Sequence, residues 1–247
     1  PIIGGSILNH EHFQGGGHLM PMHYAKIKTP LQCKKYSDVK IGIVDWYNSV
    51  IRLESDNRSS IANLAKDIIE AWENYTDESC YIYAKTDDVK HNSLSPVCRK
   101  TETGYIIDII LRNNITNEEY PDGVFHAHPE YHNIKKEGIG LIEAMGLFIL
   151  PGRLKKQLAM IADILCGKEK YDSLSLEDSD NYLYAHRNMI KDLLSEGLSD
   201  SKEQAEKRLV DKINDVCKNI LYNTAVFKPD DNGQKGFMRF LKFVGAE

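Results

Sequence analysis

The chain has 247 residues and a mass of 28.1 kDa, which is enough for one large domain or two modest ones. Hydrophobic residues make up 42% and charged residues 27%, as in an ordinary soluble globular protein. The net charge of −5 shows no basic excess, so we expect no nucleic-acid binding. Apolar runs such as 147–150 are far shorter than the ~20 residues of a membrane helix. No basic leader precedes an apolar stretch, so we expect neither a membrane span nor a signal peptide.

The first 150 residues are rich in short β-branched and aromatic runs. Residues 1–8 predict a buried strand that continues through 9–14 and breaks at three glycines, 15–17. Ser59 or Ser60 is expected to cap a helix, and the apolar residues from Ile61 to Trp72 follow its period. The other strands are expected at 41–46, 49–53, 80–84, 105–111 and 124–128, with a polar turn at 113–123.

The remainder of the chain carries a helical pattern. A helix at 154–165 is expected to stop at Gly167, and others are expected near 180–197 and 201–222. The third helix should turn four residues inward: Leu209, Ile213, Val216 and Ile220. Strands first and helices later predict an α+β fold with a mostly antiparallel sheet.

The five cysteines are scattered and form no CxxC pair, so reduced thiols in the cytoplasm are the simplest interpretation. They are Cys33, Cys80, Cys98, Cys166 and Cys217. Trp46 and Trp72 are interpreted as core residues. The lysines at 26, 28, 34 and 35 are interpreted as a solvated face.

Eight of the nine histidines precede residue 133, and the first cluster is the most informative. On a strand, His10, His12 and Gln14 would share one face, which suits a cleft better than a packed core. A neutral imidazole can act as a nucleophile near neutral pH, and an uncharged amide can donate to a phosphoryl oxygen. A surface pair or an incidental metal site is the alternative, and spacing alone does not decide between them.

These residues resemble the His-x-His-x-Gln signature of the transferase branch of the histidine-triad superfamily. More closely, the chain resembles the class II (Firmicutes-type) galactose-1-phosphate uridylyltransferases, in order and over nearly its whole length. The matching blocks are PIIGGSILNHEHFQGG at 1–16, DVKIGIVDW at 38–46, HNSLSPVCR at 91–99, FHAHPEYHNIKKE at 125–137 and IGLIEAMGLFILPGRL at 139–154.

The resemblance implies exchange of UMP between UDP-glucose and galactose 1-phosphate through a uridylyl-histidine intermediate. His12 would be the nucleophile, Gln14 would donate to the phosphoryl oxygen, and His10 would orient His12 or the phosphate. Gly5 and Ser6, with the backbone of Gly4, are candidate phosphate contacts. The fold implied is histidine-triad-like, with helices packed on the sheet and a helical C-terminal half.

The resemblance also places the hexose-binding stretch near the second strong block. Lys136, Glu143 and Arg153 are the candidates for the sugar phosphate, because it needs cations for its phosphate and a carboxylate for its hydroxyls. For Lys135 and Lys136 a solvated turn is an equal alternative.

His126 and His128 would share a face of the strand expected at 124–128. A corresponding pair in class I relatives belongs to a metal site whose glutamate this chain lacks at 19–29. His23 or His91 could substitute, and a structural hydrogen-bonded pair is the alternative. We therefore assign no metal ligands, although a divalent metal stays open.

The chain begins with Pro1 in strand-like sequence, so we expect the C-terminal part of a longer enzyme. Residues 1–30 would be the active-site segment of a histidine-triad unit whose N-terminal part is missing, and 31–247 the C-terminal uridylyltransferase domain. Alone, this chain is expected to bind nucleotides weakly and to be nearly inactive.

Two alternatives stay open at this point. One is a non-catalytic nucleotide- or metal-binding module, and the other is a histidine-triad hydrolase or phosphorylase, against which Gln14 argues. Assembly as a homodimer also stays open, because the sequence does not reveal the oligomeric state.

Overall fold

The computed structural model describes residues 13–172 and 174–247. The chain divides into two compact units, which are described separately. The sheet unit comprises Pro1–Ala127, Gly138–Leu147 and Ile220–Glu247. The helical unit comprises His128–Glu137 and Phe148–Asn219.

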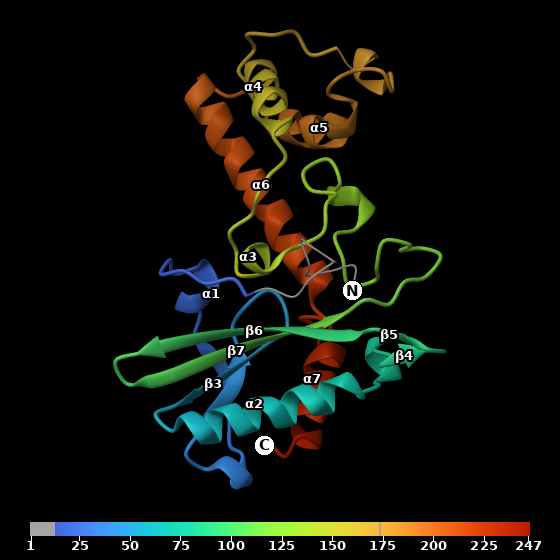
Figure 1. Ribbon diagram of the computed structural model, residues 1–247. Coiled ribbons are helices and arrows are strands. Elements are labelled where there is room, and N and C mark those ends of the chain that lie inside the picture. The colour runs from blue at the N-terminus through green and yellow to red at the C-terminus, as the bar shows by residue number, and fades with distance from the viewer. Residues whose placement is uncertain (1–12, 173) are drawn as a thin grey trace. The chain divides into compact units, whose positions relative to one another are not determined.

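The sheet unit is built on a five-stranded antiparallel sheet in the order β1-β2-β3-β7-β6 (Figure 1). Its strands are β1 (Ile27–Leu31), β2 (Lys40–Val44), β3 (Val50–Ser55), β6 (Asn92–Thr101) and β7 (Gly104–Asn113). A separate hairpin pairs β4 (Lys85–Thr86) with β5 (Val89–Lys90). Neighbouring strands of the large sheet are antiparallel throughout, so the antiparallel α+β prediction is confirmed.

One face of this sheet is packed by two helices, α2 (Arg58–Glu73) and α7 (Asp231–Phe243) (Figure 1). Their apolar residues form one core with alternate strand residues such as Ile51 and Ile109. Trp72 of α2 is fully buried there and stacks edge-on against Phe240 of α7. Burying this apolar surface is the main driving force for the unit.

The opposite face carries shorter pieces of chain. Helices α1 (Pro21–Tyr24) and α3 (Leu141–Ala144) pack there against Val50 and Ile110. Each of these helices is only four residues long, so this face is covered mostly by irregular chain. Such chain leaves room for a cavity, whereas the two long helices close the other face.

The helical unit contains α4 (Leu154–Leu165), α5 (Arg187–Ser195) and the part of α6 (Lys202–Thr224) that ends at Asn219. The 3-10 turns among the described residues are η1 (Lys34–Tyr36), η2 (Glu78–Cys80), η3 (Pro129–Tyr131), η4 (Ser175–Glu177) and η5 (Tyr184–His186). Gly167 adopts a φ of 73° after α4, which confirms it as the glycine that ends this helix. Among the described residues, no helix is long and apolar enough to span a membrane.

Several predictions from periodicity are confirmed. The strands expected at 41–46, 49–53 and 105–111 correspond to β2, β3 and β7. The helix expected at 201–222 is α6, and its four predicted inward residues are all buried. The lysines interpreted as a solvated face are all exposed. Trp72 is a core residue as predicted.

Other predictions are wrong. Residues 80–84 form a 3-10 end and a bridge at Ile82 instead of a strand, and 124–128 form turns. The helix expected from 180 begins only at Arg187, after the 3-10 turn η5. Trp46 is only half-buried: it packs against the smaller core around Val50 and Ile110, and its indole Nε1 donates to the carbonyl oxygen of Ala144. The described end of the segment expected as a strand at 9–14, residues 13 and 14, has no regular structure.

Besides the short helices α1 and α3 and the β4–β5 hairpin, three elements were not anticipated: β1, β6 and α7. The strand β6 contains Pro96 and alternates serines with apolar residues, so its pattern is weak. The helix α7 returns to the sheet unit after the helical half, which the division near residue 150 did not anticipate.

The helix α2 is capped by Asn57 and not by either serine. The Asn57 side-chain oxygen accepts from the backbone N–H groups of Ser59 and Ser60 at 3.1 and 3.2 Å. The predicted cap is therefore wrong by two or three residues, because an asparagine can cap a helix as well as a serine.

This cap gives a direct test. Asn57→Ala should lower the free energy of unfolding by about 1 kcal/mol, because two first-turn N–H groups lose their acceptor. Urea denaturation followed by circular dichroism measures the change. Ser59→Ala is the matched control and should have little effect, and equal losses in the two variants would contradict the assignment.

Candidate functional site

The predicted nucleophile segment lies mostly outside the described residues. This applies to His10 and His12, and to Gly5 and Ser6. Gln14 is described, and its side chain is exposed. It lines a cavity of about 480 Å³ in the sheet unit.

This cavity lies on the face of the sheet that the long helices leave uncovered. The chain from Gln14 to Met20 forms one side, β6 forms another, and α3 with Met145 forms the third. The polar and basic side chains lining it are Gln14, His18, His23, Arg99, Lys100 and Thr101. An amide and basic groups in one cavity suit a negatively charged ligand.

The segment after Gln14 is held against the sheet by Met22 and Arg52. The Met22 side chain is fully buried, and its backbone N–H donates to the Met145 carbonyl oxygen at 3.1 Å. The Arg52 guanidinium on β3 donates to the carbonyl oxygens of Met22 and Ala25 at 3.2 and 2.5 Å. This anchoring determines where the chain that follows the histidine motif meets the sheet.

Arg52 is itself held by Asp108, its cross-strand neighbour on β7. Arg52 Nε and Nη2 donate to the two carboxylate oxygens of Asp108 at 2.6 and 3.1 Å. Arg99 on β6 donates from Nη2 to the same carboxylate at 2.9 Å. The Asp108 side chain is fully buried, so two guanidinium groups compensate one charge that water cannot reach.

His23 stands between this network and the cavity. Its Nδ1 accepts from the Met20 backbone N–H at 3.1 Å, so Nε2 carries the ring proton. Burial, followed by the nearby Arg99 charge, lowers the pKa of His23 below 6.5. The ring is therefore neutral at pH 7 and offers a donor, not a charge.

The predicted hexose-binding residues fall in two different units. Glu143 is buried in the sheet unit and accepts from the Gly140 backbone N–H at 2.9 Å. Lys136 and Arg153 belong to the helical unit. Lys136 is exposed, whereas Lys135 is buried and donates to the Ile149 carbonyl oxygen at 3.1 Å. The solvated-turn alternative therefore describes Lys136 and not Lys135.

Arg153 is part of a network inside the helical unit. It donates to the carbonyl oxygens of His132 and Asn133 and to Gln157 Oε1. His186 is fully buried and lies 3.1 Å from the same Gln157 oxygen. Because that oxygen accepts, His186 Nε2 carries the proton, and burial lowers the pKa of His186 to about 4.

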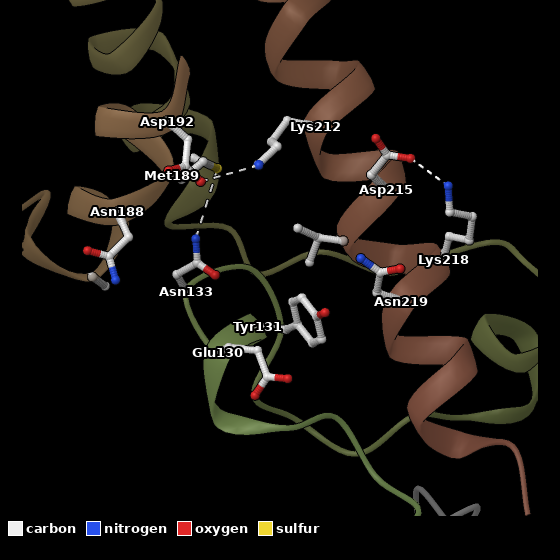
Figure 2. Close-up of a pocket in the computed structure, with 12 residues that line it drawn as sticks. Glu130, Tyr131, Asn133, Asn188, Met189, Asp192, Lys212, Asp215, Lys218 and Asn219 are labelled. Atoms are coloured by element: carbon white, nitrogen blue, oxygen red, sulfur yellow. Dashed lines mark hydrogen bonds and ion pairs between the residues drawn. The ribbon is translucent and has the colours of Figure 1, made fainter. Parts of the chain in front are cut away.

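The helical unit has its own cavity, of about 590 Å³, beside this network (Figure 2). Two ion pairs line it: Lys212 with Asp192 at 3.5 Å and Lys218 with Asp215 at 2.7 Å. In Figure 2, Asn133 lies beneath Met189, and Tyr131 and Asn219 face each other. Because these lysines are paired with carboxylates, this cavity offers an anion less charge than the sheet-unit cavity does.

His126 and His128 are not on a strand, and the two residues fall in different units. Within residues 13–172 and 174–247, no group of three His, Cys, Asp or Glu side chains could hold a metal ion. The described part of the chain therefore offers a metal ion no binding site of this kind.

Comparison with known proteins identifies the family. Residues 2–179 match the family model described as galactose-1-phosphate uridyl transferase, C-terminal domain. The chain belongs to this family. Relatives named galactose-1-phosphate uridylyltransferase include one from Caldanaerobacter subterraneus subsp. tengcongensis, 43% identical over 99% of this chain and 48% of the relative. One from Fusobacterium nucleatum is 40% identical over 100% of this chain and 48% of the relative.

A further relative, named galactose-1-phosphate uridylyltransferase 1, comes from Streptococcus pneumoniae serotype 4 and is 42% identical over 99% of this chain and 48% of the relative. The chain thus spans about half the length of the curated relatives it matches. No solved structure matches it. The family predicted from the histidine motif and its flanking blocks is confirmed.

Sequence reasoning missed the charged groups under the cavity: Arg52, Arg99 and Asp108. A signal was present, because Arg52 and Asp108 each interrupt an apolar run, at 50–53 and 106–111. A charge inside such a run is costly unless it has a partner. Two opposite charges in two such runs therefore predict an ion pair between them.

Asp108→Asn should lower the free energy of unfolding by about 3–5 kcal/mol, because it leaves buried guanidinium charge without its counter-ion. The double variant Arg52→Met with Asp108→Asn should lose less than the sum of the losses in Arg52→Met and Asp108→Asn alone. Urea denaturation of all four proteins closes the cycle. Additive losses would contradict direct coupling.

The pKa of His186 predicts acid sensitivity of the helical unit. An unfolded histidine titrates near 6.5 and the folded one near 4, so only the unfolded state binds the proton in between. Stability should therefore fall by up to about 3 kcal/mol as the pH falls from about 6.5 to 4. Denaturation at several pH values measures the slope. His186→Gln should flatten it and His18→Gln, at an exposed position, should not; an unchanged slope in His186→Gln would contradict the assignment.

Proposed function

We propose that this chain carries the nucleophile of a uridylyltransferase that exchanges UMP between UDP-glucose and galactose 1-phosphate. The observation that supports it most is the sequence His10-x-His12-x-Gln14 in a chain of this family, together with the position of its described residue, Gln14, at a cavity. In this proposal residues 1–30 supply the active-site segment and 31–247 supply the rest of the domain.

The reaction takes two displacements at one phosphorus atom. A ring nitrogen of neutral His12 attacks the α-phosphorus of UDP-glucose, forming an N–P bond and breaking the P–O bond to glucose 1-phosphate. A phosphate oxygen of galactose 1-phosphate then attacks the same phosphorus, and the N–P bond breaks. The products are UDP-galactose and free His12.

Gln14 would stabilise both transition states. Its side-chain amide is exposed at the cavity, so its N–H group is available to a phosphoryl oxygen. An uncharged donor works in each protonation state of the phosphate and of His12. His10 would orient the His12 ring.

The basic side chains of the cavity support a phosphate-bearing substrate. Arg99 and Lys100 line it, and His23 contributes a neutral N–H group. Glu143 would serve the hexose hydroxyls, whereas the described contacts of Arg153 are internal to the helical unit. The five cysteines are free, which supports the proposed cytoplasmic location.

The covalent intermediate is the decisive test. The full-length gene product containing this chain, mixed with UDP-glucose, should gain one UMP, which peptide mass spectrometry should locate on His12. His12→Ala should abolish the adduct and the exchange of glucose 1-phosphate into UDP-glucose. Gln14→Ala should slow exchange by about 10²–10³-fold, because one donor to the phosphoryl oxygen is lost.

Lys34→Ala, on the solvated face, is the control and should retain full exchange. Exchange that survives in His12→Ala would contradict the proposal. If the unmodified protein shows no exchange, and His12→Ala changes only the nucleotide affinity, the chain would be a binding module. Hydrolysis of UDP-glucose without dependence on a hexose 1-phosphate would indicate a hydrolase.

A further inference from the structure

Arg112 on β7 is a buried cation without a complete set of partners. It is 5% exposed, and its Nη2 donates to the Ile139 carbonyl oxygen at 2.7 Å. Its Nη1 is shielded from solvent and has no hydrogen-bond partner. A guanidinium in this position still has N–H groups to donate.

The charge of Arg112 is also poorly compensated. In the described part of the chain, its guanidinium forms no ion pair with a carboxylate, and Glu143 offsets only part of the effect of burial on its pKa. Burial lowers the pKa of Arg112 to about 10, so the group is still a cation at pH 7. Arg52, on the same sheet, has both a bidentate carboxylate and backbone acceptors. Buried cations normally have a counter-ion, so Arg112 stands out as a group that lacks one.

Ser93 on β6 provides a second donor beside Arg112. The two residues are directly opposite each other in the β6–β7 pair, so their side chains lie on the same face of the sheet. The Ser93 hydroxyl is buried and has no partner either. The Nη1 group of Arg112 and the Ser93 hydroxyl, both without a hydrogen-bond partner and adjacent, form a site for an anionic oxygen.

The backbone under this pair is held rigidly. Trp72 Nε1 donates to the Ser93 carbonyl oxygen at 2.9 Å and to the Arg112 carbonyl oxygen at 3.2 Å, from the core side of the sheet. The two donors are therefore positioned before any ligand arrives, which lowers the entropic cost of binding.

The pair also lies next to the candidate site along the chain. Ile139, which accepts from Arg112, is followed within three residues by Leu141 and Ile142, which line the cavity of Gln14. A ligand group held by Arg112 would approach that cavity from its α3 side.

We infer that Arg112 and Ser93 bind a phosphate group of the substrate at the sheet face next to this cavity. The phosphate is the anion that both proposed substrates carry, so the identity of the ligand rests on the proposed function, whereas the anion site itself rests on the unpartnered donors. Arg112 then binds substrate and takes no part in bond making.

Inorganic phosphate is the first probe, measured by isothermal titration calorimetry on the full-length gene product. Arg112→Met should weaken phosphate binding by about tenfold to a hundredfold, because charge-assisted hydrogen bonds are lost. Ser93→Ala should weaken it by a smaller factor, because one neutral hydroxyl is removed. Arg239→Met, on α7 with an exposed guanidinium, is the control and should bind as the unmodified protein does.

Stability separates this role from a structural one. Removing a buried cation that lacks a counter-ion should leave the urea midpoint of Arg112→Met equal to or above that of the unmodified protein. A large loss of stability, or unchanged phosphate binding in Arg112→Met, would overturn the inference. If Arg112→Met does not fold, Arg112→Lys keeps the charge but loses the planar fork, and unchanged phosphate affinity in both Arg112→Lys and Ser93→Ala overturns it as well.

The two substrates are then compared as competitors of inorganic phosphate. If the site takes the hexose phosphate, Arg112→Met raises the KM for galactose 1-phosphate more than that for UDP-glucose, and the reverse order assigns it to the nucleotide. Phosphate binding that depends on Arg112 in a protein without uridylyl transfer would refute the proposed function and leave the anion site standing. Uridylyl transfer that does not depend on Arg112 would refute the anion site and leave the proposed function standing.

Discussion

The buried carboxylate of Asp108, shared by Arg52 and Arg99, is the interaction on which the candidate site depends. The carboxylate makes it possible for Arg52 to remain charged inside the sheet, and Arg52 in turn holds the carbonyl oxygens of Met22 and Ala25. The chain that follows the histidine motif is thereby tied to the middle of the sheet. Without this charge balance, Arg52 could not stay in a place that water barely reaches.

The two faces of the sheet have different roles. Helices α2 and α7 close one face with an apolar core around Trp72, and this supplies most of the unit's stability. The other face is covered by two single-turn helices and irregular chain, and it carries the charged residues. Trp72 connects the faces, because its indole bonds to the backbone beneath Ser93 and Arg112. A rigid core on one side thus positions binding groups on the other.

The predicted elements that the structure confirms are those with strong local periodicity. The apolar face of α2 and the four inward residues of α6 repeat at helical spacing, and such spacing has one good solution. The failures are the short segments at 80–84 and 124–128, where Ile82, Phe125 and Ala127 are buried although they lie outside the named strands. Over five residues, burial of alternate side chains is compatible with several backbone conformations. Only the strand partners decide among them, and they are distant in sequence.

The sequence by itself determined the family and the residues that carry its signature, because His10-x-His12-x-Gln14 and the blocks after it are local patterns in a fixed order. It also determined the α+β class. Only the tertiary structure decided which charged residues belong together. Arg52, Arg99, Asp108 and Arg112 are spread over 61 positions of chain from 52 to 112, and strand register is what makes them neighbours or leaves one without a partner. Register depends on pairing across the whole sheet, so no local pattern contains it.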